Sequence, residues 1–263
     1  LVAEKRPDLL MRGEHITPLQ LLSYTCIPLS VGMFPHMFLH WLTAKRASTF
    51  RYTLVFYPLC IAAVWVPSVL LGVLGVIDFP NLKGAAANSV LARMIEMHAP
   101  GALAGFLAAG VLSAIMNSMD SQALAISTMF TQDIVRHYGF HDKMTEKQQV
   151  LYGRLLIVAI VVFTYVLSLF VDRSIFRISV WTFTGFAAMF PIVAAAVFWK
   201  RSTKYGALAS VFSVAVLWIY FFTKNIEDVG SGMMPVALIL IVSAAAMVIG
   251  SLLTKPPSEE VLQ

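Results

Sequence analysis

Charged residues are scarce in this sequence of 263 residues. They make up 13% of the chain, against roughly 25% in soluble domains, whereas hydrophobic residues make up 59% and the mean hydropathy is +0.78. A soluble protein of this length needs much more polar surface than that. The composition therefore excludes a soluble globular domain and predicts an all-α, polytopic membrane protein with the lipid bilayer as a partner.

Cysteines and catalytic motifs are also few. The two cysteines, Cys26 and Cys60, both lie in apolar runs, which excludes a disulfide framework and a cysteine metal site. No phosphate-binding loop, HExxH helix, hydrolase elbow or dinucleotide-binding glycine pattern occurs, so we expect neither an enzyme nor an organic cofactor. The net charge of +5 comes from short basic clusters between apolar runs, a pattern that does not favour nucleic-acid binding.

Seven apolar runs are long enough to cross a bilayer, which takes about 20 residues in a helix. They cover residues 19–43, 53–77, 102–133, 151–171, 178–199, 206–223 and 233–253. Lys and Arg concentrate in the connections 45–51, 136–154 and 200–204, which the positive-inside rule places in the cytoplasm together with the C-terminal tail. The polar segment 1–18 is then extracellular, and residues 88–98 are expected to form a short surface helix outside.

The first run contains residues that interrupt a helix. Pro28, Gly32 and Pro35 make a continuous hydrogen-bond ladder improbable. A broken helix at membrane depth frees backbone groups for ligands, although a simple proline kink is the alternative. His36 and His40 follow the break, and we expect them to be packed or hydrogen-bonded side chains without a catalytic role.

One acid, Asp120, lies near the middle of a predicted span. Ser113, Asn117, Asp120 and Ser121 follow the i, i+4, i+7, i+8 spacing of one helix face, and Ala114 and Ser118 flank them. Carboxylate, hydroxyl and carbonyl oxygens suit a hard cation such as Na⁺. Hydroxyl and small side chains alone would indicate helix–helix packing, but an acid in hydrocarbon needs a cation, a proton or a basic partner.

A second polar segment, Trp181–Phe186, has the sequence WTFTGF and lies in the outer half of its predicted span. Aromatic residues near an interface are ordinary belt residues. Contact with a substrate is the alternative function of this segment.

Three segments resemble the sodium/solute symporter family. AIMNSMDSQ (Ala114–Gln122), followed by STMFTQDI (Ser127–Ile134), is similar to the family's most characteristic helix. GMFPH (Gly32–His36) with Ala44 and Lys45 resembles the family's broken sixth core helix and its exit. FWKR (Phe198–Arg201) with Thr203, Gly206 and Ala207 resembles the end of the tenth.

The resemblance implies a LeuT-type fold with two inverted repeats. Residues 19–199 would be the second repeat, residues 200–254 two accessory helices, residues 1–18 a cut extracellular loop and residues 255–263 a cytoplasmic tail. The chain would then be the C-terminal portion of a longer protein, and its N-terminal half would be a partner missing from this sequence.

The resemblance also implies ion and substrate residues. One sodium site would use the Ala114 carbonyl with Asn117 and Ser118, where Asn117 replaces a usual hydroxyl residue. A second would use Asn117, Asp120 and Ser121, with Asp120 supplying the charge on the helix itself. Weaker substrate contacts are implied for four residues: Ser30, Gly32, Trp181 and Thr184.

The function implied is symport of a small organic solute with Na⁺ in the cell membrane, by alternating access. Two alternatives stay open: a membrane sensor module of a signalling protein, and a proton-coupled carrier that uses Asp120. A membrane enzyme or a channel is disfavoured, because catalytic motifs and repeated pore-lining charges are missing.

Overall fold

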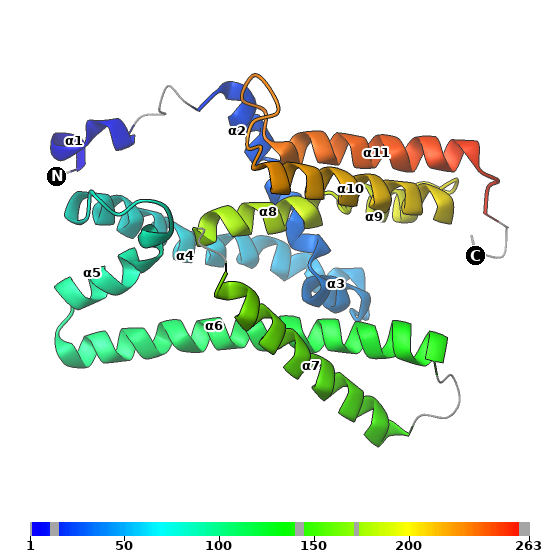
Figure 1. Ribbon diagram of the computed structural model, residues 1–263, viewed down its shortest axis with the longest axis horizontal. Helices are drawn as coiled ribbons and strands as arrows, with labels where there is room; N and C mark the ends of the chain where they lie inside the picture. Colours follow the sequence, from blue (N-terminus) through cyan, green and yellow to red (C-terminus); the bar gives the residue numbers. More distant parts are fainter. Residues whose placement is uncertain (1, 11–15, 140–144, 171–173, 258–263) are drawn as a thin grey trace. The chain divides into compact units, whose positions relative to one another are not determined.

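The computed structural model describes residues 2–10, 16–139, 145–170 and 174–257 (Figure 1). Every regular element in these ranges is a helix, which confirms the predicted all-α class. The predicted outer loop 1–18 and tail 255–263 lie partly outside the described residues.

Six described helical segments are long and apolar enough to cross a membrane. They are Ala47–Asp78, Gly101–Val135, Lys147–Ser168, Ile175–Phe198, Lys204–Lys224 and Pro235–Leu253. A seventh span is possible as a bent pair, Pro18–Met33 and Pro35–Leu42, whose two parts meet at an angle of 58°. The seven predicted runs are therefore present as helices, and the predicted interruption of the first is confirmed.

The chain forms two compact units, one of them built from residues 1–7 and 38–175. Its α-helices are α1 (Val2–Lys5), α4 (Phe50–Asp78), α5 (Val90–His98), α6 (Gly101–Met129) and α7 (Glu146–Ser168). It also has 3-10 turns over Ala47–Thr49 and Gly84–Ser89, and a π-helix over Phe130–Gly139 that continues α6. The short α5 agrees with the surface helix predicted for residues 88–98, and it packs against both α4 and α6.

Close approaches hold this unit together at a few points. A Cβ on Gly75 of α4 would lie 2.5 Å from a Val90 methyl of α5, so the glycine permits that contact. The Ser127 hydroxyl of α6 donates to the Gly153 carbonyl of α7 over 2.9 Å. Elsewhere apolar side chains face outward, and Trp65 and Phe106 are 66% and 75% exposed. Exposed apolar helix faces of this length suit lipid or further protein helices.

The other unit consists of residues 8–37 and 176–263. It contains most of α8 (Ile175–Ala187), together with α9 (Phe190–Phe198), α10 (Lys204–Lys224) and α11 (Pro235–Leu253). Its N-terminal elements are a 3-10 turn over Pro7–Leu10, α2 (Pro18–Tyr24), a 3-10 helix over Ile27–Met33 and the start of α3 (Pro35–Leu42). The helices α10 and α11 run side by side along their length (Figure 1).

A buried core joins the helices of this second unit. It consists of Trp181, Ala188, Phe221 and Ile239, from α8, α10, α11 and the α8–α9 link. The N-terminal segment is attached by a hydrogen bond in which the Met234 amide donates to the Ser23 hydroxyl over 3.2 Å.

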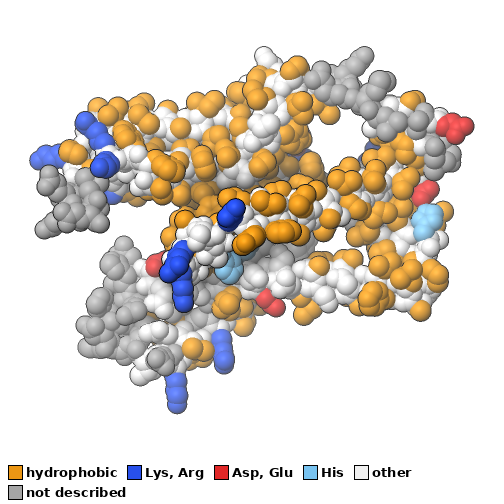
Figure 2. Space-filling view, turned by 180° about the vertical axis from the view of Figure 1, so that it is seen from behind, with side chains coloured by type: hydrophobic (Ala, Val, Ile, Leu, Met, Phe, Trp, Pro, Cys, Tyr) orange, Lys and Arg blue, Asp and Glu red, His pale blue; other side chains and the backbone are white. Residues whose placement is uncertain are grey.

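On the visible face of the molecule, hydrophobic side chains cover most of the described helices and charged side chains are few (Figure 2).

The predicted span 178–199 corresponds to one helical segment, Ile175–Phe198, which is interrupted between α8 and α9. α8 ends at Ala187, and α9 begins at Phe190 with Pro191 in its first turn. Proline has no amide hydrogen, so Pro191 cannot donate to the Ala187 carbonyl four residues earlier. The ladder is interrupted there, and residues 188 and 189 form a turn.

Candidate functional site

The predicted sodium ligands lie on one uninterrupted stretch of α6. The Ser121 hydroxyl donates to the Asn117 carbonyl over 3.0 Å, and the Gln122 amide donates to the Ser118 hydroxyl over 3.3 Å. These i, i+4 contacts confirm the helical spacing that places Asn117 and Ser121 on one face. Ala114 lies inside the same continuous helix.

All five predicted sodium residues, Ala114, Asn117, Ser118, Asp120 and Ser121, are exposed within the described chain. Among the described residues no basic side chain forms a salt bridge with Asp120. The described residues also contain no group of three or more His, Cys, Asp or Glu side chains arranged to hold a metal ion. An ion on this face of α6 would thus be held by neutral oxygens and one carboxylate, which suits a monovalent hard cation better than a transition metal.

The bent first span carries two of the predicted substrate residues. Ser30 and Gly32 lie on the 3-10 helix and are buried, and the bend follows at Phe34, whose backbone is extended (φ −62°, ψ 132°). An extended residue cannot continue the ladder, so backbone polar groups near the bend lose their helical partners. The predicted release of backbone groups at this point is supported by that geometry.

The other two predicted substrate residues lie on α8 in the same unit. Trp181 and Thr184 are 5% and 2% exposed, and the Thr184 hydroxyl donates to the Val180 carbonyl over 2.8 Å. The Phe34 ring packs against Phe183 and Phe186, with ring centroids 5.6 Å and 4.6 Å apart. The fold therefore packs the bend of the first span against α8.

Several residues of this region were not predicted from the sequence. Phe34, Phe183 and Phe186 make the contact between the bend and α8, and His36 lies 5.8 Å from the Phe34 ring. The phenylalanines were visible in the motifs GMFPH and WTFTGF, but only the tertiary packing pairs them. The predicted sodium residues belong to one compact unit and the predicted substrate residues to the other.

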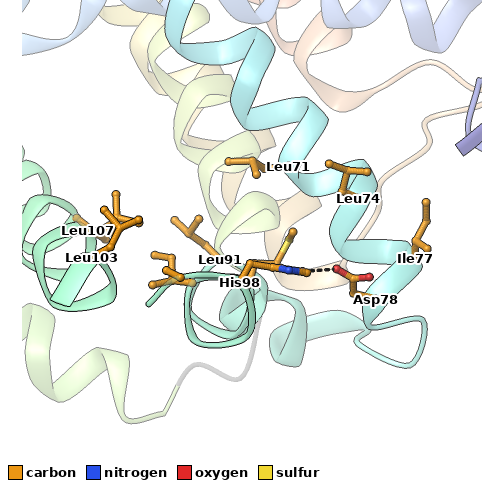
Figure 3. A pocket seen from close by; sticks show the side chains of 12 residues that line it. Leu71, Leu74, Ile77, Asp78, Leu91, His98, Leu103 and Leu107 are labelled. Atoms are coloured by element: carbon orange, nitrogen blue, oxygen red, sulfur yellow. Dashed lines mark hydrogen bonds and ion pairs between the residues drawn. The ribbon is translucent and has the colours of Figure 1, made fainter. Parts of the chain in front are cut away.

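An apolar pocket of about 650 Å³ lies between α4, α5 and the start of α6 (Figure 3). Leucines such as Leu71, Leu91 and Leu107 line it, and its polar groups are Asp78 at the end of α4 and His98 at the end of α5. The His98 Nε2 atom lies 2.8 Å from the Asp78 Oδ2 atom. This contact joins the end of the short helix α5 to the end of α4.

Removal of this pair is expected to have a small effect. The His98 and Asp78 side chains are 54% and 27% exposed, and partly exposed pairs contribute at most about 1 kcal/mol. We expect His98→Ala to lower the free energy of unfolding of the full-length protein by less than about 1 kcal/mol in thermal unfolding. Glu96→Gln, an exposed change on the same helix, is the control; a loss several times larger in His98→Ala alone would contradict the prediction.

Comparison with known proteins identifies the family. Residues 16–214 match the Sodium:solute symporter family, a stretch that includes the bent first span, the polar stripe on α6 and the predicted substrate residues on α8. The chain belongs to the sodium:solute symporter family. Its members are transporters rather than enzymes, and the resemblance found in the sequence is confirmed.

The related proteins include several proline carriers. The chain is 30% identical over 198 residues to the osmoregulated proline transporter OpuE of Bacillus subtilis, covering 73% of this chain and 39% of the relative. It is 31% identical over 160 residues to the high-affinity proline transporter PutP of the same organism (60% and 33%). It is 25% identical over 238 residues to the sodium/proline symporter of Escherichia coli (85% and 45%). The chain thus spans less than half of each of these relatives, and no solved structure matches it.

Proposed function

We propose that this chain is part of a sodium-coupled symporter of a small organic solute. The observation that carries the proposal is the family match, which extends over both the bent span and the oxygen-rich face of α6. Proline is the first candidate solute, because the relatives that match over most of this chain are named as proline carriers. Ser30, Gly32, Trp181 and Thr184 would contribute to the solute site.

The proposed mechanism is alternating access without a covalent step. Na⁺ binds to oxygens of Ala114, Asn117, Ser118, Asp120 and Ser121, and the solute then binds near the bend of the first span. The ion moves down its gradient, and a membrane potential contributes about 2.3 kcal/mol per charge per 100 mV. An N-terminal segment beyond this sequence would complete both sites, since the relatives are more than twice as long as their matched parts.

The proposed setting is the cell membrane with a cytoplasmic C-terminus. The basic connections at residues 45–51, 136–154 and 200–204 are separated by two crossings each, so one side of the membrane holds all three. In this arrangement residues 19–199 act as one inverted repeat of a LeuT-type fold, residues 200–254 add two helices, and residues 1–18 are extracellular.

Reconstitution of the full-length protein tests the proposal. An inward Na⁺ gradient across proteoliposomes is expected to drive proline accumulation, and replacing external Na⁺ with K⁺ is expected to abolish it. Uptake driven by a proton gradient without Na⁺ would favour the proton-coupled alternative. Absence of uptake for proline and for a panel of sugars, organic anions and amino acids would contradict symport and favour a sensor.

A further inference from the structure

The break between α8 and α9 leaves a backbone carbonyl free for a new partner. In a continuous helix the Ile192 amide would bond to the Ala188 carbonyl, but here it donates to the Met189 carbonyl over 3.1 Å. The Ala188 residue is fully buried, so its carbonyl needs another donor. Ser243 of α11 supplies that donor, with its hydroxyl 2.5 Å from the Ala188 oxygen.

A second serine completes this buried contact. The Ser210 hydroxyl of α10 donates to the Ser243 carbonyl over 3.0 Å and lies 2.9 Å from the Ser243 hydroxyl. Both serines are completely buried. Two hydroxyls in an apolar interior are costly unless each has a partner, so their pairing indicates a specific role in fixing Ala188.

Trp218 of α10 makes a similar contact two turns earlier on α8. Its indole N–H group donates to the Trp181 carbonyl over 2.9 Å. The Trp218 ring is stacked on Phe222 and packs edge-on against Trp181.

These contacts enclose the predicted substrate segment. The Trp181 and Ala188 carbonyls lie on either side of Thr184, and both accept hydrogen bonds from helices α10 and α11. Those two helices pack closely, because Gly206 has no Cβ to meet the backbone atoms of Met247 and Ser251. The α8 backbone is thus held at two points, one on either side of Thr184.

We propose that Ser243 and Trp218 are positioning residues, which hold the α8 backbone on either side of Thr184 in the arrangement that binds the solute. This inference rests on the proposed symport. The accessory helices would then tune solute affinity without touching the solute. A segment whose backbone is already fixed loses less conformational entropy when the solute binds. Its affinity for the solute is therefore higher.

The position of the backbone can be tested independently of transport. Hydrogen–deuterium exchange of the full-length protein is expected to speed up within residues 181–188 in Ser243→Ala and in Trp218→Phe. Ser213→Ala is the matched control, because the Ser213 hydroxyl donates within its own helix, to the Ala209 carbonyl. Equal exchange in Ser243→Ala, the control and the wild type would overturn the proposed anchoring.

Transport kinetics test the consequence for the solute. At saturating Na⁺ we expect Ser243→Ala to raise the KM for proline about fivefold with less change in kcat, the ratio expected for one lost hydrogen bond. Ser243→Thr keeps the hydroxyl and is expected to restore a KM near the wild-type value. A fall in the amount of folded protein with an unchanged KM would reduce Ser243 to a structural role and overturn the inference. Lack of uptake by the wild type would instead contradict the proposed function. Hydrogen–deuterium exchange would still show whether Ser243 and Trp218 hold the α8 backbone.

Discussion

Replacing Asp120 with asparagine is expected to raise the Na⁺ concentration for half-maximal uptake by at least about tenfold, equivalent to about 1.4 kcal/mol. The change keeps the shape of the side chain and removes only its charge. Asp120 is the one carboxylate in the oxygen stripe of α6, and no described basic side chain pairs with it. An unpaired carboxylate within a span is costly, so binding of a cation there gains more free energy than binding to neutral oxygens.

The control for this prediction is a carboxylate outside the spans. Glu96 lies exposed on α5, and Glu96→Gln changes the net charge by the same amount. Na⁺ dependence is measured by uptake into proteoliposomes at several external Na⁺ concentrations. Uptake by Asp120→Asn with the rate and Na⁺ dependence of the wild type would contradict a role for this carboxylate. If uptake by the wild type is driven by protons and does not depend on Na⁺, loss of that uptake in Asp120→Asn would assign Asp120 to proton coupling.

The spans and the first interruption could be predicted from local sequence because their causes are local. Apolar runs of sufficient length suffice for the spans, and Pro28, Gly32 and Pro35 together break the helix that contains them. The break at Ala188 has an equally local cause in Pro191, but a single proline inside an apolar run is also compatible with a kinked helix. The distinction depends on the donor from Ser243, 55 residues later in the chain.

In the candidate sites, too, features with a local cause could be predicted and features that depend on tertiary packing could not. Helical periodicity alone places Asn117, Asp120 and Ser121 on one face, and the structure keeps that spacing. The pairing of Ser210 with Ser243 could not be predicted, since serines occur at many positions of these helices and only tertiary packing selects two. Likewise, nothing in the sequence pairs Phe34 with Phe186.

The largest effect on stability is expected at Gly206, where backbone atoms of α11 lie against α10. A Cβ at this position would lie 2.7 Å from the Met247 carbonyl oxygen and 2.9 Å from the Ser251 nitrogen. Both are backbone atoms of α11 and cannot rotate away, so the helices must separate. Separation would also strain the nearby bond from the Thr203 amide to the Ser251 hydroxyl, which spans 3.2 Å.

Gly206→Ala should therefore destabilise the protein by about 1–3 kcal/mol, although alanine is favoured over glycine in a helix by about 1 kcal/mol. Gly72→Ala on α4 is the matched control, because no described atom lies within 4 Å of its Cβ position, and helix propensity then predicts a neutral or stabilising change. Thermal unfolding of both full-length variants measures the difference. Equal midpoints would contradict close packing of α10 on α11 at Gly206.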